Sequence, residues 1–376
     1  MNSLSVFLYR RVVRPALLAR VDSDLMRAHY AGITLLKRVQ NHPYILSAVR
    51  RWATVTDPRL SQDLFGLRFP NPVGLAAGLD KNCEVFLALE ALGFGAVVGG
   101  TVTLDPQSPL DDAFIAEYPA LRSLINRLGF PNTGSHAIAD ELSQSPGTTI
   151  PRGLNIGLSR KLRVMGPADD YKLTLRAIYS HADFIEVNVS SPNTKNIREL
   201  QETGYFLAVL GAVIEEAERQ SRPNQRKPIL VKISPDIAEP TLAGLLKACL
   251  ELGVDGLVVA NTSLKRIGFP ADTPVVGGVS GKPLFMGTRR LVRIIYQQTA
   301  GRLPIIAVGG ISSAEDAFAM FENGASLVQV YTGFVTRDPF IARHINRGLL
   351  KLMRRRGIAH ISDIPKPSLD APPSSE

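Results

Sequence analysis

The 376-residue sequence has few cysteines, no long apolar run and no clustered metal ligands. Its two cysteines, Cys83 and Cys249, lie far apart, which argues against a disulfide framework or a zinc cluster and fits a reducing compartment. No segment approaches the roughly 18 unbroken apolar residues of a membrane-spanning helix. The six histidines are scattered, and none joins acidic residues at a predicted strand end, so we expect no metal. No G-x-G-x-x-G follows an early strand, which disfavours a dinucleotide-binding sheet.

Positive charge is concentrated at the N-terminus. The net charge is +9, and residues 1–55 carry nine Arg or Lys against two Asp, which accounts for +7. Apolar residues recur there with helical spacing, so we expect a basic amphipathic helical extension, a type that favours the membrane interface over nucleic acid. A solvated helical hairpin packed on the main domain is an equally open interpretation. The acid-free, Arg-rich first twenty residues also leave a transit peptide open.

Short apolar runs alternate with helical patterns after residue 70. The runs lack polar alternation, as is typical of parallel strands covered on both faces. They are Pro72–Ala76, Ala96–Thr101, Gly153–Ile156, Phe184–Val189, Ile229–Ile233, Gly256–Asn261, Ile305–Gly309 and Leu327–Tyr331. Eight strands alternating with helices predict an α/β fold, a (β/α)8 TIM barrel that follows the N-terminal amphipathic helical extension. An open doubly wound sheet is the alternative.

Helix signals and composition divide the chain into three expected parts. The helical patterns 81–92, 241–252 and 317–323 each end at a glycine, and Ser312 and Ser313 resemble an N-cap. Residues 102–150 are longer than one connection needs and should form an excursion over the barrel top. We therefore expect an N-terminal extension over residues 1–55, a barrel over 56–360 and a Pro/Ser-rich, disordered tail over 361–376.

Polar side chains gather where the predicted strands end, which is where barrels of this kind carry their active sites. Residues 188–194 read Asn-Val-Ser-Ser-Pro-Asn-Thr, a set that suits gripping a small polar molecule and moving a proton, although alone it is also typical of a turn. Lys232 stands inside an apolar strand, where a functional cation is favoured over a snorkelling one. Gly309-Gly310 and Tyr331-Thr332-Gly333 match a phosphate site. This inventory suits a phosphorylated flavin with a small anionic, amide-rich substrate.

Nine motifs in order carry a resemblance that runs from about residue 9 to residue 356. They are residues 71–81 (NPVGLAAGLDK), 100–103 (GTVT), 126–130 (NRLGF), 155–157 (NIG), 188–194 (NVSSPNT), 261–262 (NT), 280–284 (SGKPL), 309–311 (GGI) and 331–333 (YTG). Together they make the chain resemble the class 2, quinone-dependent dihydroorotate dehydrogenases. The resemblance implies an FMN-dependent oxidation of (S)-dihydroorotate to orotate in pyrimidine (UMP) biosynthesis, with quinone as final electron acceptor.

Carried over residue by residue, the resemblance implies that Ser191 is the catalytic base. Ser191 would take the C5 proton of dihydroorotate while a hydride passes from C6 to FMN N5; a serine needs help from its neighbours for this. The implied substrate residues are Lys81, Asn126, Arg127, Leu128, Gly129, Phe130, Asn188, Asn193, Asn261 and Thr262, with Lys81 or Arg127 meeting the carboxylate. The implied FMN residues are Ala77, Gly78, Leu79, Asp80, Lys81, Thr101, Asn155, Asn188, Lys232, Ala260, Gly281, Gly309, Gly310, Tyr331 and Thr332.

Four departures from the family pattern stand beside the resemblance. Residues 195–198 are Lys-Asn-Ile-Arg where the family has Pro-Gly-Leu-Arg, Pro131 replaces an amide, and Ala260 replaces a hydroxylated residue. Residues 104–121 lack the arginine that the family places near its quinone tunnel. The alternatives are therefore a flavin-dependent dehydrogenase with another acceptor or a related pyrimidine, and a barrel that binds flavin without turnover.

The resemblance also implies where the protein acts. The family's helical extension docks on a membrane and admits quinone, so we expect a peripheral protein that contacts the membrane surface through its N-terminal helices. We expect the cytoplasmic face of the inner membrane for a bacterial protein and the mitochondrial inner membrane for a eukaryotic one. The short extension favours the bacterial location.

Overall fold

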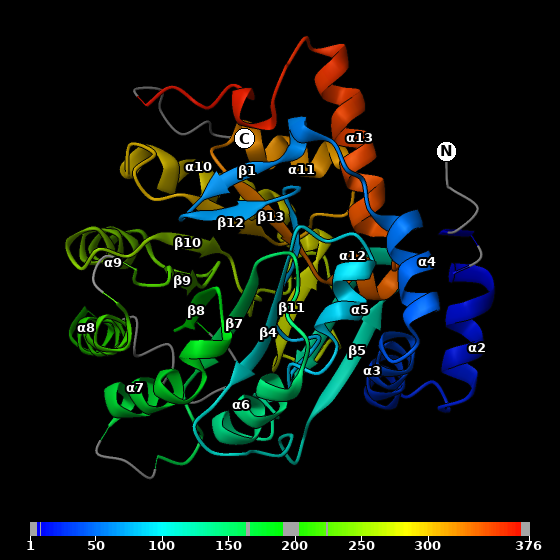
Figure 1. The fold of residues 1–376 in the computed structure, drawn as a ribbon, viewed down its shortest axis with the longest axis horizontal. Coiled ribbons are helices and arrows are strands. Elements are labelled where there is room, and N and C mark those ends of the chain that lie inside the picture. The colour runs from blue at the N-terminus through cyan, green and yellow to red at the C-terminus, as the bar shows by residue number, and fades with distance from the viewer. Residues whose placement is uncertain (1–5, 8, 163–165, 191–202, 223–224, 370–376) are drawn as a thin grey trace.

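A closed barrel of eight parallel strands forms the centre of the molecule (Figure 1). The computed structural model describes residues 6–7, 9–162, 166–190, 203–222 and 225–369. The barrel strands are β3 (Val73–Leu75), β4 (Ala96–Val102), β7 (Arg152–Gly157), β8 (Phe184–Asn188), β9 (Ile229–Ile233), β10 (Gly256–Val259), β12 (Ile305–Val308) and β13 (Leu327–Val330). They pair in this order, and β13 returns to β3. The predicted TIM barrel is confirmed, and each predicted strand is present.

Helices cover the outside of the barrel (Figure 1). They are α5 (Phe86–Ala91), α6 (Ser135–Gln144), α7 (Pro167–Ile178), α8 (Thr203–Gln220), α9 (Glu239–Glu251), α10 (Phe285–Gln298), α11 (Ala314–Glu322), α12 (Thr332–Thr336) and α13 (Ile341–Arg355), with the short turns η4 (Tyr179–His181) and η7 (Ile361–Asp363). Ser313 caps α11 as expected, because its side chain accepts from Asp316 N. The helix predicted to begin at Lys81 instead begins at Phe86, which is a correction explained below by the contacts of Asp80.

Two apolar layers hold the barrel together. The larger one lies between the strands and the surrounding helices. The smaller one fills the barrel interior and includes Phe184, Leu230 and Val258. Hairpin β1 (Gln62–Leu64) and β2 (Leu67–Phe69) contributes Phe69 to this inner layer, with its ring 6.5 Å from that of Phe184. Because the interior is packed with side chains at this level, a ligand can enter only from the opposite end, where the strands terminate.

The excursion after β4 folds into its own small sheet. Its strands β5 (Phe114–Tyr118) and β6 (Ser123–Arg127) pair antiparallel around the turn η3 (Pro119–Leu121). Strand β11 (Gly278–Gly281), followed by the turn η6 (Lys282–Leu284), pairs with β6 on its other edge. The predicted excursion over residues 102–150 is confirmed, and β11 joins it from far along the sequence.

Helices at the N-terminus pack beside the barrel. The extension consists of η1 (Tyr9–Val13), α2 (Arg14–Ala19), α3 (Leu25–Gln40) and α4 (Pro43–Ala53), and a 3-10 turn η2 (Pro58–Leu60) follows it. The Asp24 carboxylate caps α3 by accepting from Met26 N and Arg27 N. Helix α3 contacts α4, α5 and β5 (Figure 1). Within the described ranges, no helix combines the length and apolar character that crossing a membrane requires.

The C-terminal segment is a correction to the expected disordered tail. Ile361 and Ile364 are buried in the outer apolar layer. The Lys366 ammonium donates to the carbonyl oxygens of Phe321 and Ala325 at 3.0 and 2.7 Å. The Pro/Ser content suggested disorder, but two buried isoleucines and these hydrogen bonds hold residues 361–366 on the barrel. Residues 370–376 lie outside the described part of the chain.

Candidate active site

A pocket opens where the barrel strands end, beneath the β5–β6–β11 sheet. The space between its walls is about 1260 Å³, with the open mouth included. Most of the predicted site residues line it: Ala77, Gly78, Lys81, Thr101, Asn126, Leu128, Gly129, Phe130, Asn188, Lys232, Ala260, Asn261, Thr262, Gly281, Gly309, Gly310, Tyr331 and Thr332. Residues that are far apart in the sequence therefore meet at one cavity, as expected for the carboxyl end of such a barrel.

Glycines let the backbone segments of one pocket wall pack closely against one another. Gly281 has a φ of +93°, and a Cβ there would lie 2.3 Å from the carbonyl oxygen of Arg122. Gly310 has a φ of +73°, and its Cβ would lie 2.7 Å from the backbone nitrogen of Phe285. Helix α12 starts beside them at Thr332, and the first amides of a helix have no acceptor within it. This corner suits a small anion such as phosphate.

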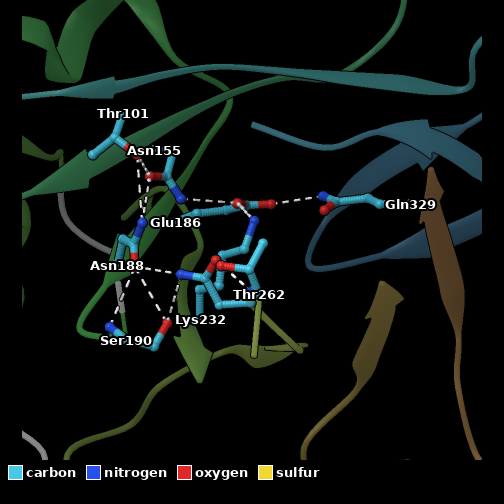
Figure 2. A network of polar contacts seen from close by, with 9 residues as sticks. Thr101, Asn155, Glu186, Asn188, Ser190, Lys232, Thr262 and Gln329 are labelled. Carbon is cyan, nitrogen blue, oxygen red and sulfur yellow. Dashed lines mark hydrogen bonds and ion pairs between the residues drawn. The ribbon is translucent and has the colours of Figure 1, made fainter. Parts of the chain in front are cut away.

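A buried polar network forms the floor of the pocket (Figure 2). The Glu186 carboxylate on β8 accepts from Asn155 Nδ2 at 3.1 Å and from Gln329 Nε2 at 2.6 Å. Lys232 Nζ lies 3.9 Å from Glu186 Oε2. Burial lowers the pKa of Lys232, and the Glu186 charge opposes that shift. The barrel thus holds the Glu186 carboxylate and the Lys232 amino group close together, directly above its apolar interior.

Above this floor, Asn188 and Ser190 (Figure 2) are hydrogen bonded to each other and to Asn261. Asn188 Oδ1 accepts from Asn261 Nδ2 at 3.2 Å and from Ser190 Oγ at 3.2 Å, and Asn261 Nδ2 also donates to Ser190 Oγ at 3.1 Å. Thr101 Oγ1 donates to Asn155 Oδ1 at 2.6 Å. Because these bonds fix each amide, donors and acceptors are already oriented before a ligand binds.

Lys81 connects the pocket with the N-terminal extension. Its Nζ lies 2.6 Å from Nε2 of His29, which comes from α3. Burial lowers the pKa of Lys81 to about 7, and the nearby Asp80 charge opposes this. Burial and then the Lys81 charge lower the pKa of His29 to about 3. His29 is therefore neutral near pH 7 and can accept a hydrogen bond from the ammonium.

The loop over residues 126–130 bends across the pocket and is held by hydrogen bonds from the excursion. Gln107 Nε2 donates to the carbonyl oxygens of Gly129 and Phe130, both at 3.0 Å. Arg127 behaves differently from its neighbours, because its Nε donates to Asp112 at 2.8 Å and its side chain does not line the cavity. Of the two cations considered for a substrate carboxylate, Lys81 is the one that faces the pocket.

Three more predicted residues sit next to the pocket without lining it. Leu79 is buried in the outer apolar layer. The Asp80 carboxylate accepts from Glu84 N and Val85 N, both at 2.8 Å, so it organises the turn before α5. Burial raises the pKa of Asp80 to about 6. Asn155 lies within the barrel, where its side-chain oxygen accepts the hydrogen bond from Thr101. Ser191 and Asn193 lie outside the described residues.

Residues at and behind the pocket wall were absent from the sequence prediction. Gln329 lines the floor, Glu186 supports it, and His29 reaches Lys81 from the extension. A signal existed for the first two, since each is a polar residue between two apolar ones in a strand, as Lys232 is. His29 gave no such signal, because its contact depends on how α3 docks. In the part of the chain that the structure describes, no group of three or more His, Cys, Asp or Glu could hold a metal.

Comparison with known proteins places this site in a family. The family model described as "Dihydroorotate dehydrogenase" matches residues 59–353. A curated relative from Deinococcus deserti, named "Dihydroorotate dehydrogenase (quinone)", is 41% identical over 95% of this chain and 98% of its own length. One from Salinispora arenicola with the same name is 43% identical over 89% of this chain and 97% of its own length.

Solved structures show the same likeness. DHODH from Eimeria tenella has a TM-score of 0.79 and 30% identity in its ligand-free type, covering 90% of this chain and 99% of that one. Its complex with ferulenol has a TM-score of 0.76 and 31% identity, covering 86% and 94%. The matched region contains the barrel and every residue that lines the pocket. The chain therefore belongs to the dihydroorotate dehydrogenase family, whose members are oxidoreductases.

Proposed function

We propose that this chain oxidises (S)-dihydroorotate to orotate with bound FMN and passes the electrons to a quinone. The observation that carries the proposal is the pocket. In this member of the family, one cavity combines a glycine-lined anion corner, oriented amides and the ammonium groups of Lys81 and Lys232. The anion corner suits the FMN phosphate, and the amides match the carbonyl and N–H groups of a pyrimidine ring.

The pocket residues fit a flavin on an observation of their own. The carbonyl oxygen of Gln329 is buried and has no hydrogen-bond partner in the described structure, although its amide nitrogen is bonded to Glu186. A buried acceptor without a partner is costly, so an N–H of a ligand is its natural complement. The glycines at 281, 309 and 310 allow close packing around the anion corner, because a Cβ at each would lie 2.7 Å or less from a neighbouring protein atom.

FMN, when bound, supplies the acceptor for the substrate hydride. Lys232 places a cation at the floor, which favours a ring that gains negative charge. Lys81 binds the substrate carboxylate, while Asn188 and Asn261 hold the ring amides. Ser191 removes the C5 proton, with neighbouring polar groups accepting a bond from its hydroxyl. Asn126, Asn193 and Thr262 complete the substrate contacts. The pocket-lining residues among those expected to bind FMN hold the cofactor, whereas Leu79, Asp80 and Asn155 act from behind the wall.

The N-terminal helices form the acceptor side of the enzyme in this proposal. Residues 1–55 act as a separate extension on the barrel of residues 56–360, and His29 of α3 reaches Lys81 at the pocket wall. Phe7, Val12 and Val13 are exposed apolar groups on a basic segment, a combination that binds membrane surfaces. We place the protein peripherally on the membrane that holds its quinone, which is the cytoplasmic face of the inner membrane in a bacterium.

A different electron acceptor is the second candidate, and one observation favours it. Glu117 in the excursion forms an ion pair with Arg14 of α2, and both side chains are largely buried. Residues 104–121 contain no arginine, and the cation at this segment comes instead from the extension and faces an acid. A changed acceptor would leave substrate oxidation intact and alter only the second half-reaction.

Turnover with a panel of acceptors separates these readings. Purified protein is incubated with dihydroorotate and either a short-chain ubiquinone, a naphthoquinone, fumarate or NAD, and orotate is measured by chromatography. Orotate formation with a quinone supports the proposal. Formation with fumarate or NAD alone identifies another acceptor, and the absence of orotate with all four overturns the substrate assignment.

A further inference from the structure

Glu186 is a carboxylate with no exposed surface inside an apolar barrel strand. It lies on β8 between Ile185 and Val187, both of which are also fully buried. A charged group at such a site costs much free energy unless it is hydrogen bonded and paired. The proposed chemistry gives Glu186 no contact with the substrate, so its presence requires another explanation.

The contacts of Glu186 join three strands around one carboxylate. Asn155 of β7 donates to Oε2 at 3.1 Å, and Gln329 of β13 donates to Oε1 at 2.6 Å (Figure 2). Both partners donate, which matches an ionised carboxylate because that group only accepts. On β9, Lys232 faces the same oxygen as Asn155, at 3.9 Å. All of this charge and polarity converges at the pocket floor.

Unused hydrogen-bonding groups remain on the pocket side of this cluster. The 3.9 Å separation is too long for a hydrogen bond, and Lys232 Nζ donates none to any residue that the structure describes. The Gln329 carbonyl oxygen likewise has no partner there. Lys232 and Gln329 both line the cavity, whereas Glu186 does not. Glu186 thus contacts Gln329 through a hydrogen bond and Lys232 through its charge, and the unused groups of both residues face the cavity.

We propose that Glu186 is a positioning residue of the flavin site, where its carboxylate keeps the Lys232 ammonium charged and aims the Asn155 and Gln329 amides. The inference rests on the proposed function, because it assigns the free ends of Lys232 and Gln329 to the flavin ring. It adds a role for a residue that contacts neither cofactor nor substrate.

The charges around Lys232 determine the sign of the expected effect. Burial lowers the pKa of Lys232, and Glu186 is the one charge that opposes this shift. On the neighbouring strands, β8 carries Glu186 and β10 carries no titratable side chain. The remaining charged groups of the described pocket wall are cations: Lys81, Arg122, Lys282 and Arg337. Without the Glu186 charge, Lys232 therefore loses its proton at a lower pH.

The test is the midpoint potential of the bound flavin as a function of pH in Glu186→Gln, which keeps the side-chain size. At acidic pH, where Lys232 stays charged, the potential should equal or exceed that of the wild type, because a negative charge is gone. At alkaline pH the reduction equilibrium should fall at least tenfold, about 30 mV for a two-electron couple. Glu90→Gln, which changes a buried carboxylate far from the pocket, is the matched control and should follow the wild type.

A double variant shows whether Glu186 acts through Lys232. In a Lys232→Met background, Glu186→Gln should no longer change the pH dependence of the potential. The inference is overturned if the flavin potential of Glu186→Gln has the same pH dependence as that of the wild type. It is also overturned if Glu186→Gln shifts the potential equally with and without Lys232. A wild-type protein that binds no flavin, or whose flavin dihydroorotate does not reduce, instead refutes the proposed function.

A readout that needs no flavin covers the case in which Glu186→Gln binds it poorly. Competitive acetylation across pH, followed by peptide mass spectrometry, measures the reactivity of Lys232 directly. Lys232 should react at lower pH in Glu186→Gln than in the wild type, and equal profiles contradict the inference. Glu186→Asp keeps the charge but moves it back by one methylene, and this variant serves if Glu186→Gln does not fold. In Glu186→Asp, the pH at which Lys232 reacts should fall by less than expected for Glu186→Gln.

Discussion

Lys81 is the single residue whose charge most directly controls ligand binding in this account. It lies between His29 of α3 and the pocket, and burial lowers its pKa to about 7. His29 cannot share the charge, because its own pKa is lowered to about 3. Near neutral pH, the protonation of one lysine therefore decides whether a cation faces the substrate carboxylate.

Orotate affinity should consequently depend on pH. The group that binds the carboxylate is the protonated form of Lys81, so affinity is full below pH 7 and falls above it, by about tenfold per pH unit well above the pKa. Titration of flavin absorbance with orotate between pH 6 and 9 measures this. Lys81→Met should bind weakly at every pH and lose the dependence, and a wild-type affinity that is flat across this range contradicts the assignment.

Ser191→Ala should leave a yellow protein with little turnover. The substitution removes the proposed base but none of the proposed FMN contacts, and loss of a positioned general base costs on the order of 10² to 10⁴ in rate. Flavin content and the rate of orotate formation are measured on the same sample. Ser143→Ala, on the exposed face of α6, is the control. Full activity in Ser191→Ala excludes Ser191 as the base.

Most of the residues that line the pocket could be predicted from the sequence, but the residues that hold them in place could not. Polar residues at strand ends predict the pocket lining because barrel topology brings those ends together. Lys232 and Glu186 are both charged residues between apolar ones in a strand, but only the role of Lys232 follows from its place at a strand end, because the role of Glu186 depends on contacts from three other strands. Arg127 could not be separated from Lys81 in sequence, since its pairing with Asp112 depends on how the excursion folds.

Helix α5 shows how elements distant in sequence define one another. Its start at Phe86, rather than Lys81, follows from Asp80, whose carboxylate takes the amides of Glu84 and Val85 into a turn. Gln40 of α3 then accepts from Leu87 N and Ala88 N at 3.1 and 3.3 Å. The periodicity of residues 81–92 predicted a helix there, but the capping by α3 is a tertiary contact that periodicity does not encode.

Gln40→Ala should therefore weaken the docking of α3. Alanine is a good helix former, so the substitution does not weaken α3 itself. It removes the acceptor for two first-turn amides of α5, and we expect the free energy of unfolding to fall by about 1 kcal/mol. Denaturant unfolding with an unchanged m-value measures it. Gln298→Ala, at the exposed end of α10, should have no such effect. Equal stabilities for the two variants would show that Gln40 does not cap α5.

The whole molecule is asymmetric in charge, since +7 of its +9 lies in residues 1–55. The same segment exposes Phe7, Val12, Val13 and Tyr44, which is 92% exposed. The order of strands and the basic extension were both predictable, because repeated apolar runs and local charge are properties of sequence. The buried C-terminal segment was not, because Ile361 and Ile364 find their partners only in the folded barrel.

This asymmetry predicts how the protein meets a lipid surface. Val12→Asp with Val13→Asp should reduce sedimentation with anionic phospholipid vesicles at least tenfold, and added salt should weaken wild-type binding. Val275→Asp is the matched control, because Val275 is 81% exposed but lies outside the extension. Binding that survives the double substitution, or equal loss in the control, would refute the extension as the membrane contact.

Anaerobic mixing of the purified protein with L-dihydroorotate, followed by a quinone, tests the central claim most directly. The account predicts that the flavin absorbance bleaches on adding dihydroorotate, with orotate formed in equal amount, and that it returns when the quinone is added. A flavin that dihydroorotate fails to bleach, or a protein that carries no flavin, would contradict the account.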